Sequence, residues 1–170
     1  MNKLIAILED DERRAEAMRQ EIAQRFPSFD CIIFENAPDM ITWLKDSLEK
    51  VTIMSLDHDL GPNSERNGKV FDPGVGRDVV DFLEIQKPIC PVIIHTTNRF
   101  GGDGMRYALE EAGWTVKRIV PLDDLSWIKN EWITIIAKLI EEFNPEWKDL
   151  YSELNCQDEF PPSQEDRTKQ

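Results

Sequence analysis

Acidic and imidazole side chains follow short apolar segments at three separate places in the sequence. They are Glu9, Asp10, Asp57, His58 and His95. The chain contains two histidines, and both occupy such a position. Carboxylates bind hard divalent cations, and an imidazole with a pKa near neutrality can transfer protons. If the fold brings these groups together, they could support metal-assisted acid–base chemistry.

The carboxylates of Glu9, Asp10 and Asp57 are the candidate metal ligands. Three carboxylates placed close together repel one another, and a divalent cation relieves that repulsion. Oxygen ligands suit Mg²⁺, and a nearby imidazole would shift the preference toward Mn²⁺ or Zn²⁺, so the expected cofactor is a divalent metal, Mg²⁺ or Mn²⁺. A second interpretation is that the acidic run caps the first helix, which we expect of Asp11.

The candidate catalytic residues are His58 and His95, as an acid–base pair, together with Asp57. Which histidine is the base stays open, and each ring could instead cap backbone or pack beneath a loop. Residues 101–104, Gly-Gly-Asp-Gly, precede a predicted helix, so the backbone N–H of Gly101 could receive a phosphate. A plain flexible turn explains these glycines equally well.

The side chains are positioned by alternating strands and helices. Apolar runs predict strands at residues 4–8, 30–34, 51–56, 92–94 and 115–120, and stripes at helical spacing predict helices between them. Nearly uninterrupted apolar strands are typical of a parallel sheet covered on both faces. The predicted fold is therefore α/β, a doubly wound five-stranded parallel sheet of order 2-1-3-4-5. In such a sheet ligands bind outside the carboxyl ends of the strands, where the polar residues above should converge.

The chain of 170 residues predicts one domain, residues 1–143, and a C-terminal extension, residues 144–170. Within the extension, residues 145–154 are expected to form a short helical segment, and the polar residues 157–170 are expected to be disordered. Residues 57–76 are rich in glycine, proline and asparagine and predict a long polar loop.

The charge and the cysteines limit the partners and the compartment. A formal net charge of -13 opposes binding to duplex DNA and to anionic membranes. The three cysteines are widely spaced and form no CxxC motif, which indicates reduced thiols in the cytoplasm. Apolar runs are too short to cross a bilayer, and the oligomeric state stays open.

The motifs resemble response-regulator receiver domains over residues 1–143. Leu8-Glu9-Asp10-Asp11-Glu12 is similar to the acidic pair that ends their first strand, and Asp57 takes the place of their phosphoacceptor aspartate. Thr96 is similar in position to their switch residue. Receivers also carry a lysine directly before a proline after the fifth strand, whereas here Val120 precedes Pro121. Lys117 and Arg118 lie earlier, and the turn after Asp57 is longer.

One branch of that superfamily resembles this chain more closely. Residues 57–61, Asp-His-Asp-Leu-Gly, and residues 95–98, His-Thr-Thr-Asn, followed by Gly101, look like motifs of the cyclic-phosphate-processing receiver family. The resemblance implies hydrolysis of a cyclic phosphate of RNA or a nucleotide, so the expected partner is a phosphate-containing small molecule or an RNA end. Residues 95–97 are also similar to the His-x-Thr element of two-histidine phosphoesterases, so Thr96, Thr97, Asn98 and Gly101 are the expected phosphate-binding residues.

Three hypotheses follow. The first is a metal-assisted cyclic phosphodiesterase that uses the histidine pair. The second is a signalling receiver phosphorylated on Asp57, and the missing lysine and the longer turn argue against it. The third is a receiver used only as an interaction module, with no affinity for metal or phosphate.

Overall fold

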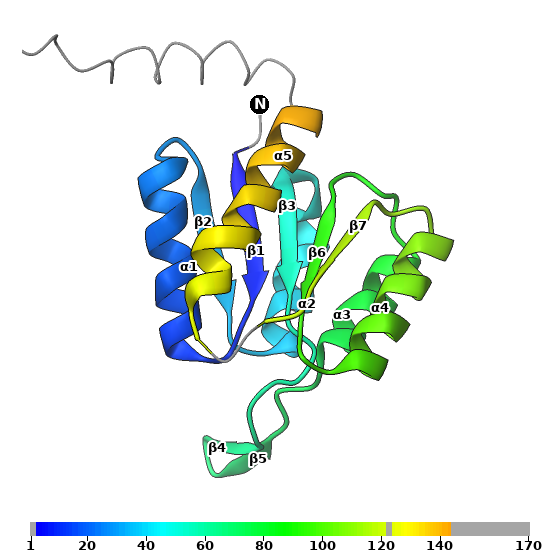
Figure 1. Ribbon diagram of the computed structural model, residues 1–170. Helices are drawn as coiled ribbons and strands as arrows, with labels where there is room; N and C mark the ends of the chain where they lie inside the picture. Colours follow the sequence, from blue (N-terminus) through cyan, green and yellow to red (C-terminus); the bar gives the residue numbers. More distant parts are fainter. Residues whose placement is uncertain (1–2, 122–123, 144–170) are drawn as a thin grey trace, which may run out of the picture.

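The protein folds as a five-stranded parallel sheet between two layers of helices (Figure 1). The computed structural model describes residues 3–121 and 124–143. The strand order is β2-β1-β3-β6-β7, which confirms the predicted doubly wound order. The sheet strands are β1 (Leu4–Leu8), β2 (Asp30–Phe34), β3 (Val51–Leu56), β6 (Val92–His95) and β7 (Val116–Ile119). The helices are α1 (Glu12–Arg25), α2 (Ala37–Ser47), η1 (Leu48–Lys50), α3 (Gly76–Glu84), α4 (Arg99–Glu111), η2 (Ile128–Trp132) and α5 (Ile133–Phe143).

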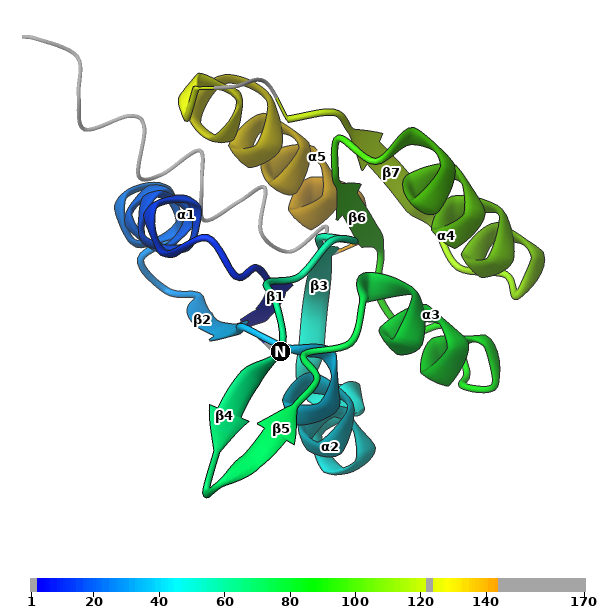
Figure 2. The same cartoon turned by 90° about the horizontal axis from the view of Figure 1, so that it is seen from below.

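Alternate residues of each strand face opposite helical layers, and each face has its own apolar core. Ile5 and Ile7 of β1 pack with α1 and α5, whereas Ala6 and Leu8 pack with α2, α3 and α4. Figure 2 shows α1 and α5 on one side of the sheet and the other three long helices on the opposite side. Residues in phase with Ile5 and Ile7 therefore face the layer formed by α1 and α5.

The strand register brings three polar residues to the same level. Leu8 pairs with Leu56, and Leu56 pairs with Ile94, so the next residue on each of three adjacent strands is Glu9, Asp57 or His95. The backbone N–H of Asp57 donates to the Leu8 carbonyl at 3.0 Å, which extends the pairing to the end of the strand. The predicted convergence of polar residues at the carboxyl edge of the sheet is confirmed for these three.

The segment between β3 and α3 is more ordered than the sequence analysis expected. It contains an antiparallel hairpin formed by β4 (Ser64–Arg66) and β5 (Lys69–Phe71), which projects from the sheet in Figure 1. Its turn is Asn67-Gly68, with φ of 55° and 73°, the positive values that a tight hairpin turn requires. A long loop without secondary structure was therefore the wrong prediction, and the Asn-Gly pair was the signal for a hairpin.

The interpretation of the glycines at residues 101–104 as a turn before a helix is also wrong, because α4 begins at Arg99 and contains them. The Asn98 side chain accepts a hydrogen bond from the Gly101 backbone N–H at 2.8 Å and so caps the helix. The final helix begins with the π-helical turn η2, which runs into α5. Among the described residues, no helix is long and apolar enough to span a membrane. The helical and disordered segments predicted within residues 144–170 lie outside the described residues.

Candidate functional site

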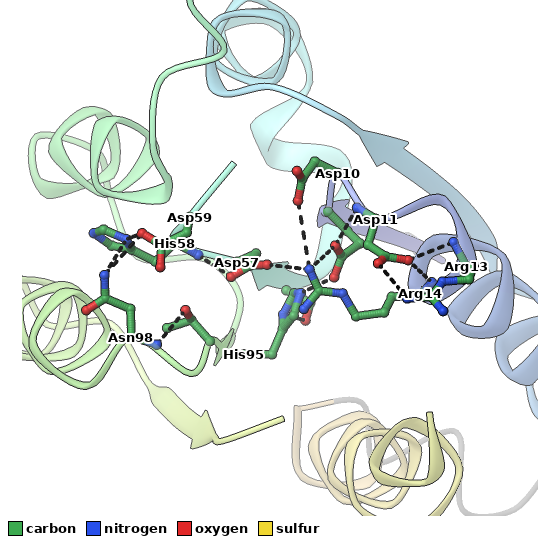
Figure 3. Close-up of polar contacts among 12 residues, drawn as sticks. Asp10, Asp11, Arg13, Arg14, Asp57, His58, Asp59, His95 and Asn98 are labelled. Carbon is green, nitrogen blue, oxygen red and sulfur yellow. Dashed lines mark hydrogen bonds and ion pairs between the residues drawn. The ribbon is translucent and has the colours of Figure 1, made fainter. Parts of the chain in front are cut away.

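Glu9, Asp57 and His95 form a buried cluster at the carboxyl edge of the sheet. Figure 3 shows Asp57 and His95 of this cluster beside Arg14. One ligand atom from each of the three clustered residues lies within 4.8 Å of the other two. Glu9 and His95 are fully buried, and His95 Nε2 lies 3.3 Å from Glu9 Oε2. Neither atom has a hydrogen-bond partner of good geometry among the described residues. Because a buried polar atom without a partner is costly, this cluster has unused capacity for a ligand.

Arg14 holds the three carboxylates together, a contact that the sequence analysis missed. Its Nη2 lies 2.9 Å from Glu9 Oε1, 3.1 Å from Asp57 Oδ2 and 3.8 Å from Asp10 Oδ1. The sequence feature that indicates this contact is the i,i+4 spacing of Asp10 and Arg14 at the start of a predicted helix. One guanidinium does not neutralise three carboxylates, so the cluster keeps an affinity for further positive charge.

The pKa values of the carboxylates reflect this surplus of negative charge. Burial raises the pKa of Asp57, the charge of Glu9 adds to the effect, and His95 and Arg14 oppose it. Burial likewise raises the pKa of Asp10, with a further contribution from Glu9. A proton or a metal cation would each relieve the same repulsion.

The His95 ring is held by residues that come from β3 and from the final helix. Ser55 Oγ lies 2.8 Å from His95 Nδ1 and accepts a hydrogen bond from Trp132 Nε1 at 2.9 Å. The Trp127 ring stacks on the imidazole with centroids 5.8 Å apart. Both tryptophans are buried in the core, and they also fix the ring so that Nε2 points toward Glu9. The sequence analysis did not identify Ser55 as a site residue. The feature that indicates its role is a hydroxyl within an apolar strand, two residues before Asp57.

His58 belongs to a second, more exposed group of polar side chains. Its Nδ1 lies 2.7 Å from Asp59 Oδ1, and Asn98 Nδ2 donates to the same oxygen at 3.1 Å. Burial alone would raise the pKa of Asp59, but the hydrogen bonds with His58 and Asn98 outweigh it and lower that pKa. The imidazole lies against Gly101, where a Cβ atom would overlap the ring.

The structure places the two imidazoles in different surroundings, not in the expected mutual pair. His95 lies within the buried cluster, whereas the His58 ring points away from it in Figure 3. The link between the groups is Asp57, whose Oδ1 accepts the backbone N–H of His58 at 2.6 Å. Among the described residues the two rings share no hydrogen-bond partner. If His58 and His95 act in the same reaction, they must therefore be coupled through Asp57 or through a bound ligand.

The candidate phosphate-binding residues take different places in the β6–α4 connection. Thr96 is buried, and its hydroxyl accepts the Asn98 backbone N–H at 3.2 Å. Thr97 is exposed at the edge of the sheet, and the Asn98 side chain faces His58. The Gly101 backbone N–H is already bound to Asn98, so it caps the helix and is not available for a phosphate. Thr97 and Asn98 remain the accessible candidates.

Comparison with known proteins agrees with this geometry. Over residues 5–111, more than half of the chain, the sequence matches the family described as the cyclic-phosphate processing receiver domain. The chain belongs to this receiver family. The matched region contains both polar groups described above. No curated protein sequence matches the chain.

Solved receiver structures share the fold of this receiver. The phosphorylated cyanobacterial phytochrome response regulator RcpA superimposes with a TM-score of 0.59 at 14% identity, over 84% of this chain and 94% of that chain. The non-phosphorylated receiver domain of RcsB from Escherichia coli gives 0.56 at 14% identity, over 84% and 95%. A response regulator from Colwellia psychrerythraea gives 0.56 at 16% identity, over 81% and 99%. At these identities the likeness shows the fold alone.

This receiver lacks the lysine that signalling receivers carry directly before the proline after their fifth strand. The residue before Pro121 is Val120, and the positive charge beside Asp57 comes from Arg14 on α1. Arg118 donates to the carbonyls of Thr96 at 3.0 Å and Asn98 at 3.2 Å. It therefore holds the backbone of the β6–α4 connection in place and does not contact the buried carboxylates.

Proposed function

We propose that this receiver is a divalent-metal-dependent phosphoesterase that opens a cyclic phosphate of RNA or of a nucleotide. The observation that carries the proposal is the pair of unpartnered buried atoms, Glu9 Oε2 and His95 Nε2, beside Asp57. The two atoms lie 3.3 Å from each other, and a bound cation would give both of them a partner. The family description supports the class of substrate.

The residues fit a divalent cation held by Glu9, Asp57 and His95. Two carboxylates and one imidazole favour Mn²⁺ over Mg²⁺, because imidazole nitrogen is a softer ligand than oxygen. Asp10 is partly exposed at the rim and completes the acidic surroundings. The bound cation would supply charge stabilisation for a phosphate oxygen. Ser55 keeps the His95 ring oriented toward the cluster.

His58 is the residue proposed to move protons. In the reaction, water attacks phosphorus, one of the two ester P–O bonds breaks, and the leaving oxygen takes up a proton, which gives a phosphomonoester. The contact with Asp59 fixes the orientation of the imidazole, as a carboxylate does for many catalytic histidines. Asn98, which faces His58, and the exposed Thr97 that precedes it would orient the phosphate.

The test measures metal binding and turnover separately. Wild-type protein with Mn²⁺ should hydrolyse a 2′,3′-cyclic nucleotide, and ³¹P NMR would measure this reaction. Addition of a metal chelator should stop the hydrolysis. A cation at 100 times its Kd should stabilise the native state by about 2.7 kcal/mol. For a chain of this size that raises Tm by about 5–10 °C.

Two variants separate the proposed metal-binding role of His95 from the proposed proton-transfer role of His58. His95→Ala should lose the Mn²⁺-induced rise in Tm together with activity. His58→Ala should keep the rise in Tm but lose about 100-fold or more of the rate. If wild-type protein turns over no cyclic phosphate in a panel tested with Mn²⁺ and Mg²⁺, the proposal is wrong.

The second candidate function is phosphorylation of Asp57 in signalling. The position of Asp57 at the end of β3 favours it, since receivers carry their phosphoacceptor there. Both carboxylate oxygens are already engaged, Oδ2 by Arg14 and Oδ1 by the backbone of His58. Incubation with acetyl phosphate separates the two functions. A signalling receiver should gain the mass of one phosphoryl group, measured by mass spectrometry, and Asp57→Asn should abolish that gain. A chain with neither metal nor phosphate affinity would be an interaction module.

A further inference from the structure

A groove with lysines at its rim lies at the amino edge of the sheet, opposite the polar site. It consists of two adjoining hollows of about 700 and 410 Å³, which share Glu49, Lys87 and Ile89. The first lies between the C-terminal ends of α2 and α3, and the second crosses the starts of β3 and β6 to Phe143 at the end of α5. We refer to both hollows together as the amino-edge groove.

The groove combines an apolar floor with a positive rim. Leu48, Phe82 and Ile89 supply apolar surface, and Ile89 is 39% exposed. Three exposed lysines surround them, Lys45, Lys50 and Lys87, against two acidic residues. These five side chains together carry a formal charge of +1, in a chain whose formal net charge is -13. Such a surface suits an acidic segment with an apolar stripe.

The chain carries a segment of that composition directly after the groove. Trp147, Leu150, Tyr151 and Leu154 follow one another at i, i+3, i+4 and i+7, the spacing of one helical face. Three acidic residues accompany them: Glu146, Asp149 and Glu153. Asn144 and Pro145 precede the stripe, and an Asn-Pro pair is a common start signal for a helix.

We propose that residues 145–154 form an amphipathic helix that docks in the amino-edge groove of the same chain. Phe143, the last described residue, already lines the groove, so the segment begins at its proposed binding site. Ten helical residues extend about 15 Å. The apolar stripe would cover the floor, while the acidic residues face the lysines at the rim.

Hydrogen exchange of the full chain tests the docking. Amides of residues 147–154 should exchange at least about 10-fold more slowly than those of the same sequence as a free peptide. Carbodiimide treatment should join Lys45, Lys50 or Lys87 to an acidic residue of the segment. The double substitution Trp147→Asp and Leu150→Asp should abolish the protection and speed exchange in residues 44–50 and 82–89. Because both positions follow Phe143, the last residue of the described fold, the variant should still fold.

Matched controls separate docking from a general effect of charge. Lys148→Asp introduces a charge off the apolar stripe and should leave the protection of residues 149–154 within about 2-fold. Lys87→Glu should weaken the protection and the cross-link, whereas Lys117→Glu on β7, away from the groove, should change neither.

Three outcomes would overturn the proposal. The first is exchange of residues 147–154 at the rate of the free peptide. The second is a set of cross-links that leads to lysines outside the groove. The third is cross-linking mainly between two copies in a mixture of ¹⁴N- and ¹⁵N-labelled protein, which would make the occupant a second chain.

Discussion

The hydroxyl of Ser55 should contribute far more stability than its size suggests. Ser55→Ala removes one atom from the sheet face that packs against the final helix. It leaves Trp132 Nε1 and His95 Nδ1 buried without the partner that each now has, at 2.9 and 2.8 Å. Each orphaned polar group costs about 1–3 kcal/mol, so the expected loss for the two groups is about 2–6 kcal/mol. For a chain of this size, 3 kcal/mol lowers Tm by roughly 6–12 °C.

A double-mutant cycle in urea, with chelator present, gives the sharpest measurement. Trp132→Phe removes the indole N–H, so in the Ser55→Ala background it also removes one of the orphaned groups. The two substitutions together should therefore cost about 1–2 kcal/mol less than the sum of the single effects. If Ser55→Ala falls within about 0.5 kcal/mol of wild type, or if the two effects are additive, the hydroxyl does not hold the indole and the imidazole as described.

Two further perturbations test neighbouring parts of the structure. Gly102→Ala should destabilise by about 1–3 kcal/mol in urea unfolding, because its Cβ would collide with the Arg118 guanidinium. Gly104→Ala in the same helix meets nothing within 4 Å and should stabilise by about 0.5–1 kcal/mol, and a reversed order would contradict this packing. Asp57→Asn should raise Tm at pH 7.5 in chelator and should lose that advantage at low pH. The reason is that the folded-state pKa of Asp57 is raised above its ordinary 3.8, so the native wild type binds the proton more tightly and loses stability as pH rises through that window. An advantage that grows as pH falls would contradict the raised pKa.

The departures from expectation have local physical causes. The glycines at 101, 102 and 104 suggested a turn, but Asn98 caps a helix there, and two of the glycines admit the His58 ring and the Arg118 guanidinium. Arg118 is distant along the chain from this helix, so no local pattern reveals the contact. The hairpin between β3 and α3 was recognisable from Asn67-Gly68, whose signal was hidden by the polar composition around it.

Alternation of apolar strands and amphipathic helices determined the sheet, its order and the edge at which Glu9, Asp57 and His95 meet. Burial of apolar surface depends on periodicity, which is written in the chain itself. Only the tertiary structure decided that His95 joins the carboxylates while His58 turns toward Asp59 and Asn98. It also placed Arg14 and Ser55 in the site. Those choices depend on which side chains from separate elements can satisfy one another's buried polar atoms, and that complementarity exists only after the elements have packed.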